Sequence, residues 1–89
     1  MARFEIADAD LAGSSTKALS ADVFLRLGID HSIGRGVPAD MIAAHKWLNL
    51  AAREGNSDAI RLRREISQEM SAADIAEAQR QAREWLCRH

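Results

Sequence analysis

The chain has 89 residues, a length that accommodates one domain. Apolar residues make up 47% of it and aromatic residues only 4%, which argues against a bulky sheet core and favours closely packed helices. The formal net charge of −1 excludes a strong overall attraction to nucleic acid or to an anionic membrane.

The expected compartment follows from the cysteine count and from the hydropathy of the chain. Cys87 is the only cysteine, so no disulfide can form within the chain, and a reducing compartment is favoured. The first residues carry acids and lack the apolar centre of a secretory signal. No stretch approaches the roughly 18 apolar residues of a transmembrane helix. We therefore expect a cytoplasmic protein that does not interact with a membrane.

Residues 1–17 show no sustained hydrophobic period, and the run from Gly13 to Thr16 is typical of a loop. We interpret 1–17 as a flexible N-terminal arm and 18–89 as the folded domain. The first helix is predicted to begin near Ser20, a good N-cap residue. It is predicted to end at Gly34 and Gly36, because glycine tolerates the left-handed conformation that closes a helix.

Three more helices are predicted from their start and stop signals. Pro38 fits the opening of a second helix, and Gly55 ends it. A third helix is predicted to begin at Ser57. Ser71 and Asp74 form a variant of the capping box, which opens the fourth helix. Because short loops make neighbouring helices antiparallel, we predict an all-α fold of two helical hairpins stacked as a short α/α solenoid fragment.

The two predicted hairpins repeat each other weakly. Ala44-x-x-Trp47 recurs as Ala82-x-x-Trp85, 38 residues further on. A period in the thirties is typical of helical-hairpin repeats.

A denser pattern of small and aromatic residues covers residues 23–59. Its positions are Val23, Leu27, Gly28, Gly34, Gly36, Val37, Asp40, Ala44, Trp47, Ala51, Ala52, Gly55 and Ala59. In this pattern the chain resembles one full Sel-one-like repeat, a relative of the tetratricopeptide repeat. His31 stands where the family usually has tyrosine. Residues 60–89 keep chiefly Ala82 and Trp85, and so resemble a degenerate capping repeat.

The resemblance implies an α/α solenoid that acts as an adaptor in protein–protein contacts, with an unidentified partner. The physical roles of the motif residues follow without it. Gly28 and the alanines allow helix backbones to approach closely. Trp47 supplies a large apolar body between the hairpins. Gly34 and Gly36 allow a sharp reversal of the chain.

Sites for catalysis, cofactors or metals are disfavoured. Gly34-x-Gly36-x-x-Ala39 matches the dinucleotide fingerprint in letters, but a helix precedes it where that motif needs a strand. His31, His45 and His89 are not spaced to converge on a metal. The carboxylates are spread among basic residues, and two hairpins rarely enclose a substrate pocket. We predict no enzyme activity, no cofactor and no metal.

The C-terminal hairpin is rich in arginine. Its arginines are Arg61, Arg63, Arg64, Arg80, Arg83 and Arg88. Glutamates interleave with them, which is typical of ion pairs on a solvated helix face, and no aromatic residue lies among them to stack on bases. Nucleic acid is therefore disfavoured, but a nucleic-acid-linked regulator remains the first alternative function. A non-catalytic subunit of an enzyme complex is the second.

The leading hypothesis is a module that binds another protein, or a second copy of itself, on its helical surface. So short a stack is expected to leave apolar surface exposed, and such a patch often marks an interface. By analogy with related repeats, we expect contacts on the first helix of each hairpin, at Phe24, His31 and Arg35. Trp85 and Leu86 on the last helix are further candidates.

The apolar surface of the first helix has two explanations that the sequence leaves open. Leu25, Ile29 and Ile33 join Phe24 in making this helix apolar nearly all round. Either a partner covers these residues, or the N-terminal arm folds over them with Phe4, Ile6 and Leu11.

Overall fold

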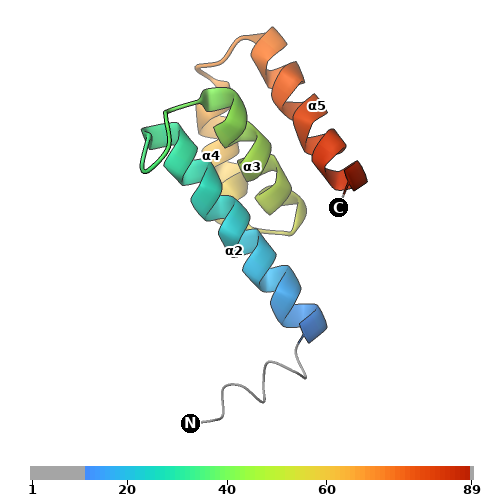
Figure 1. Cartoon of the computed structure of the whole chain (residues 1–89). Helices are drawn as coiled ribbons and strands as arrows, with labels where there is room; N and C mark the ends of the chain where they lie inside the picture. Colours follow the sequence, from blue (N-terminus) through green and yellow to red (C-terminus); the bar gives the residue numbers. More distant parts are fainter. Residues whose placement is uncertain (1–11, 89) are drawn as a thin grey trace.

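The computed structural model describes residues 12–88, with side chains described from residue 21 onward, and is all-helical in that range (Figure 1). Its helices are α2 (Ala12–Ile33), α3 (Met41–Arg53), α4 (Ser57–Ser67) and α5 (Ala72–Arg88). Successive helices run in opposite directions, so α2 with α3 and α4 with α5 form the two predicted hairpins (Figure 1). The predicted fold class is confirmed.

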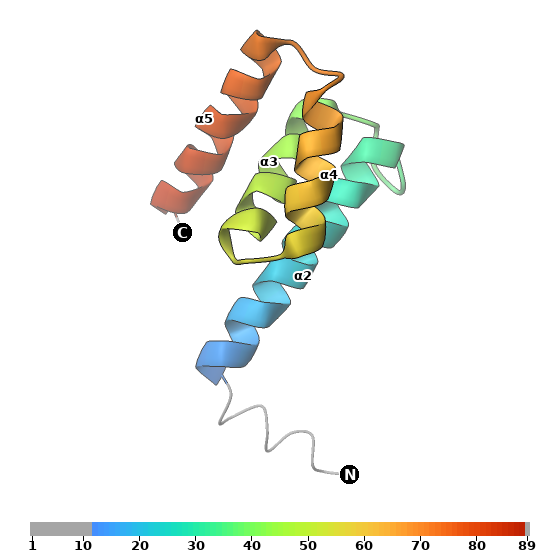
Figure 2. The same ribbon diagram turned by 180° about the vertical axis from the view of Figure 1, so that it is seen from behind.

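Helix α3 is the centre of the arrangement. It packs against α2, α4 and α5, and the views from front and behind show α4 and α5 on different sides of it (Figure 2). The two helices of the second hairpin therefore pack chiefly on α3 rather than on each other.

Small side chains allow this close packing. The buried apolar residues are Ala21, Phe24, Ala44, Leu48, Leu50, Ala51, Ala59, Ala78 and Ala82. A Cβ atom added to Gly28 would lie 2.6 Å from both Cγ and Cδ2 of Leu48, so the contact between α2 and α3 requires glycine at this position. The predicted role of Gly28 and the alanines is confirmed.

The predicted start of the first helix was wrong. Helix α2 begins at Ala12 rather than near Ser20, so residues 12–17 of the predicted arm are helical, and residues 1–11 lie outside the described residues. A glycine costs a helix only about 1 kcal/mol relative to alanine, and serine costs less. Once a helix is nucleated and packed, it can therefore extend through a stretch whose local signals favour a loop.

The capping signals of the later helices are partly confirmed. The side chain of Asn56 accepts a hydrogen bond from Ala59 N at 2.8 Å and caps α4. Ser71 Oγ accepts one from Asp74 N at 3.0 Å at the start of α5. Pro38 does not open α3, because Asp40 is its N-cap and accepts a hydrogen bond from Ala43 N at 3.1 Å.

Glycine ends α2 and α3, as predicted. Gly34, Gly36 and Gly55 have φ angles of 77°, 76° and 92°, in the region that favours glycine. At the end of α2, Asp30 O accepts hydrogen bonds from the backbone N–H groups of Gly34 and Arg35 at 2.8 and 2.9 Å. These bonds satisfy a carbonyl that the helix leaves without a partner.

Candidate protein-binding groove

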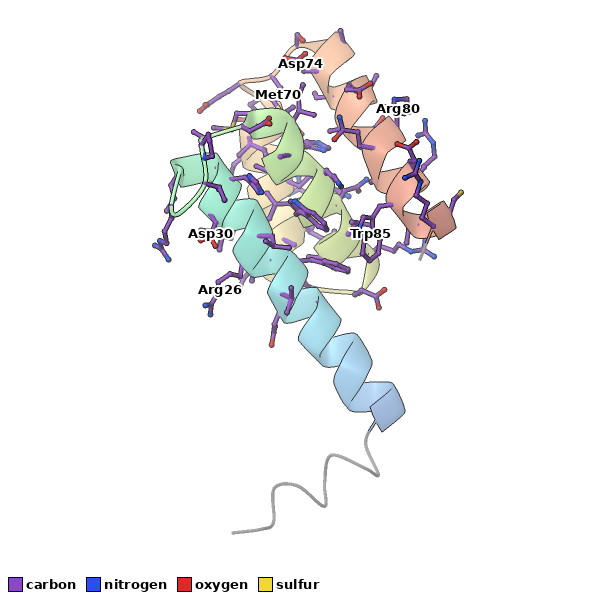
Figure 3. All side chains as sticks on the ribbon, viewed as in Figure 1. Arg26, Asp30, Met70, Asp74, Arg80 and Trp85 are labelled. Atoms are coloured by element: carbon purple, nitrogen blue, oxygen red, sulfur yellow. The ribbon has the colours of Figure 1, made fainter. Side chains whose placement is uncertain are left out.

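Three aromatic rings from three helices form one cluster. The ring centroids of Phe24 and Trp47 are 5.8 Å apart, those of Phe24 and Trp85 are 5.2 Å apart, and those of Trp47 and Trp85 are 6.0 Å apart. Trp85 points from α5 toward the body of the bundle (Figure 3). The predicted role of Trp47, to fill the space between the hairpins, is therefore confirmed, and Trp85 shares it.

The prediction that Phe24 is an exposed contact residue was wrong. Phe24 is only 9% exposed, because it faces both tryptophans. The aromatic cluster joins α2, α3 and α5, and burial of apolar rings of this kind is the main favourable term in folding. A charged residue at position 24 would disrupt the fold itself and could not report on partner binding.

The other four predicted contact residues do not share one surface. His31 is half-buried and Arg35 is exposed, with Nη1 4.0 Å from Asp30 Oδ1, at the turn between α2 and α3. Trp85 and Leu86 belong to the last turn of another helix, α5. Trp85 is half-buried, whereas Leu86 is 37% exposed.

On the first helix, Ile33 is exposed, whereas Leu25 and Ile29 are half-buried. Leu25 packs against the core. Phe4, Ile6 and Leu11 of the arm lie outside the described residues.

The residues of the predicted repeat motif contribute to the packing. Ala44, Ala51 and Ala59 are fully buried, and Ala52 packs against the core cluster. Leu27 is half-buried on the side of α2 where Asp22, Val23 and Arg26 line a shallow hollow.

A groove runs between α4 and α5, with α3 at its floor. It has a volume of about 330 Å³. Its lining residues, which define what we call the arginine groove, are Asn49, Leu50, Ala52, Arg53, Ile60, Arg63, Ala82, Arg83 and Leu86. The groove exists because α4 and α5 both pack on α3, on different sides of it (Figure 2).

The ion pairs divide the arginines of the C-terminal hairpin into two groups. Arg61 pairs with Asp58 and Glu65 on its own helix. Arg80 and Arg88 both pair with Glu84. These pairs confirm the predicted i, i+4 pattern on the exposed faces of α4 and α5.

Glu77 strengthens the pairing of Arg80. Its Oε2 lies 2.7 Å from Arg80 Nη2. The hydrogen bonds from Arg80 and Gln81 lower the pKa of Glu77 to about 2, and the same pair raises the pKa of Arg80. Arg80 lies beside Lys46 in a second hollow, of about 250 Å³. The cations of this hollow already have partners, since Lys46 Nζ lies 4.4 Å from the centre of the Trp47 ring.

The arginines of the groove lack such partners. Arg63 donates a hydrogen bond from Nη1 to Asn49 Oδ1 at 2.6 Å, an uncharged acceptor. Arg53 and Arg83 are exposed and form no ion pair with any residue of the described range 21–88. The groove thus carries three positive charges and no lining carboxylate.

Sequence reasoning singled out Arg63 and Arg83 but missed Arg53, Asn49, Leu50 and Ile60. The sequence contains a signal that distinguishes the groove arginines from the paired ones. None of the three groove arginines has an acidic residue three or four positions before or after it, whereas Arg61 and Arg80 do. The absence of a helical partner marks an arginine that is free to contact something else.

His45 is a buried titratable residue that the sequence did not single out. It is 2% exposed, and its Nε2 lies 3.0 Å from Ser67 Oγ. Ser67 donates its hydroxyl hydrogen to Arg63 O at 2.7 Å, so it accepts the second bond and His45 Nε2 is the donor. Burial, and secondarily the charge of Arg63, lower the pKa of His45.

This geometry makes His45 and Ser67 a packing contact between α3 and α4, since the hydroxyl is already engaged and the imidazole is shielded from solvent. Among the described residues, no three His, Cys, Asp or Glu side chains gather in a way that could hold a metal ion.

No family model, curated protein or solved structure matches this chain. Within residues 12–88, none of the helices combines the length and the apolar character that crossing a membrane requires.

Proposed function

We propose that the chain is a protein-binding module that docks a partner protein in the arginine groove. One observation carries the proposal: the groove combines partly exposed apolar side chains, Ile60 and Leu86, with cations that have no carboxylate partner in the described part of the chain. Apolar surface beside unpaired charge is typical of binding sites, where the apolar part supplies affinity and the charges supply specificity.

The resemblance of residues 23–59 to a Sel-one-like repeat supports the same proposal, because it implies an adaptor role. We also propose a cytoplasmic location. The single thiol of Cys87 is free and exposed, which fits a reducing compartment.

The test is affinity capture from an extract of the cells that make the protein, with three forms of the chain compared. The groove variant carries Arg53→Glu and Arg83→Glu. The control variant carries Arg26→Glu and Arg64→Glu, which change the net charge equally. Arg26 and Arg64 are also exposed, and neither lines the arginine groove.

We expect one or a few proteins to be retained by the wild type and the control variant, and lost from the groove variant. Retention of nothing, or equal retention by all three forms, would overturn the proposal. A light-scattering mass of the pure chain belongs to the same experiment. A dimer that the groove variant abolishes would make the bound partner a second copy of the chain.

A further inference from the structure

We propose that the occupant of the arginine groove is an acidic amphipathic helix of the partner, which packs against α5 as α4 packs against α3. This inference rests on the proposed function and adds the chemical class and the pose of the partner.

The charge of the groove argues for an acidic occupant. Arg53, Arg63 and Arg83 come from three different helices and line one hollow. Like charges brought together repel one another, and no carboxylate of the lining offsets them. A segment with Asp or Glu side chains would supply that offset. Arginine is well suited to it, because its planar guanidinium can bind a carboxylate with two parallel hydrogen bonds.

The floor of the groove argues for an amphipathic occupant. Leu50 and Ala82 are almost fully buried at its base, and Ile60 and Leu86 remain partly exposed at its sides. An apolar face on the occupant would remove Ile60 and Leu86 from water, which favours binding.

The internal repeat argues for a helix. The repeat that aligns Ala44 with Ala82 also aligns Leu48 with Leu86. Leu48 is 1% exposed in the core, whereas its equivalent Leu86 is 37% exposed. The two positions have the same residue type and repeat position, but different burial.

Leu48 packs against Gly28 of α2, and a different side of α3 is covered by α4. On α3, His45 and Asn49 receive polar contacts from Ser67 and Arg63 of α4. Their equivalents on α5 are Arg83 and Cys87, and both are exposed. No helix in the described part of the chain covers α5 as α4 covers α3. A helix from a partner would fill that place, in the mode by which amphipathic helices bind grooves.

A nucleic acid fits these features less well. The groove lining contains no aromatic residue on which a base could stack, and the net charge of the chain is −1. Phosphates would also leave the apolar side chains of Ile60 and Leu86 in contact with water.

The test is a selection from displayed random peptides of about 16 residues, roughly four helical turns, on the immobilised full-length chain. We expect the enriched peptides to place Leu, Ile or Phe at i, i+3, i+4 and i+7, with Asp or Glu beside them. A synthetic copy of an enriched peptide should bind the Arg53→Glu, Arg83→Glu variant on the order of tenfold or more weakly than the wild type. It should bind the Arg26→Glu, Arg64→Glu control as the wild type does.

A milder variant, Arg53→Gln with Arg83→Gln, keeps the size of the side chains and removes their charge. It should give an intermediate loss, and thermal melting followed by circular dichroism checks that every variant is folded. Enrichment of neutral or basic peptides, no enrichment, or equal binding to the groove and control variants would overturn the inference. If such a result accompanied loss of captured cellular protein from the groove variant, the proposed function would stand and only the partner class would be wrong.

Discussion

The indole rings of Trp47 and Trp85 meet nearly edge to face, with their centroids 6.0 Å apart and their planes at 75°. The two residues end the recurring Ala-x-x-Trp pattern, so a periodicity of the sequence becomes a direct contact between α3 and α5. Phe24 of α2 contacts both rings and links the first helix to the last.

Substitution of Trp85 by alanine should destabilise the protein by about 2–3 kcal/mol. This value lies below the range for fully buried aromatic residues because Trp85 is half-buried. Trp85→Phe should lose less, since it keeps an aromatic ring beside Phe24. Urea unfolding followed by circular dichroism measures both variants, and a loss below about 0.5 kcal/mol for Trp85→Ala would contradict a structural role for the cluster.

Gly28→Ala should be destabilising although alanine is the better helix former. The intrinsic preference for alanine is worth about 1 kcal/mol. The added Cβ would meet Leu48 at 2.6 Å and Ala44 O at 3.3 Å, so we expect a net loss of about 1–2 kcal/mol.

The control for Gly28→Ala is a double-mutant cycle with Leu48→Ala. Removing the Leu48 side chain makes room for the new Cβ, so Gly28→Ala should cost less in that background. Equal costs in both backgrounds would show that the steric contact with Leu48 is not the cause.

His45 should make the stability of the protein depend on pH. Because burial lowers the pKa of the folded-state imidazole, the unfolded chain binds more protons as the pH falls below the ordinary value of 6.5. The contribution is complete above that pH and is lost as the pH falls toward the folded-state pKa. The slope for one proton is at most about 1.4 kcal/mol per pH unit.

Urea unfolding between pH 8 and 5 measures this dependence. His45→Gln keeps a side-chain N–H donor for Ser67 but does not titrate, so the decline below pH about 6.5 should be shallower in that variant. Identical pH profiles for the two proteins would show that His45 is not the titrating group.

Asn56→Ala should cost about 1 kcal/mol, because Ala59 N loses its side-chain acceptor at the start of α4. Asn56→Asp keeps an acceptor and adds a charge that the N-terminus of a helix favours, so it should retain stability. Chemical unfolding measures the stability of the two variants, and similar losses of stability for Asn56→Ala and Asn56→Asp would contradict a capping role.

Part of the candidate site could be predicted from sequence. Leu86 was expected to be accessible and is 37% exposed, and the arginines of the last hairpin were recognised as a group. The division of the arginines into those with and those without an ion-pair partner was not foreseen. Arg53, Arg63 and Arg83 nevertheless have no acidic residue three or four positions away in the sequence. The expected contact face on the first helix was misassigned at Phe24, because a helix apolar nearly all round does not reveal which side its neighbours cover.

The sequence by itself determined the number of helices in the described range, the glycines that end α2 and α3, the start of α4 and the cap of α5. These features depend on interactions within a few residues, so local residue preferences are sufficient to specify them. Only the tertiary structure decided that Phe24 is buried, that His45 lies under α4, and that an arginine-lined groove remains between α4 and α5. Each of these depends on α3 packing with three helices at once, and such packing is set by side chains far apart in the chain.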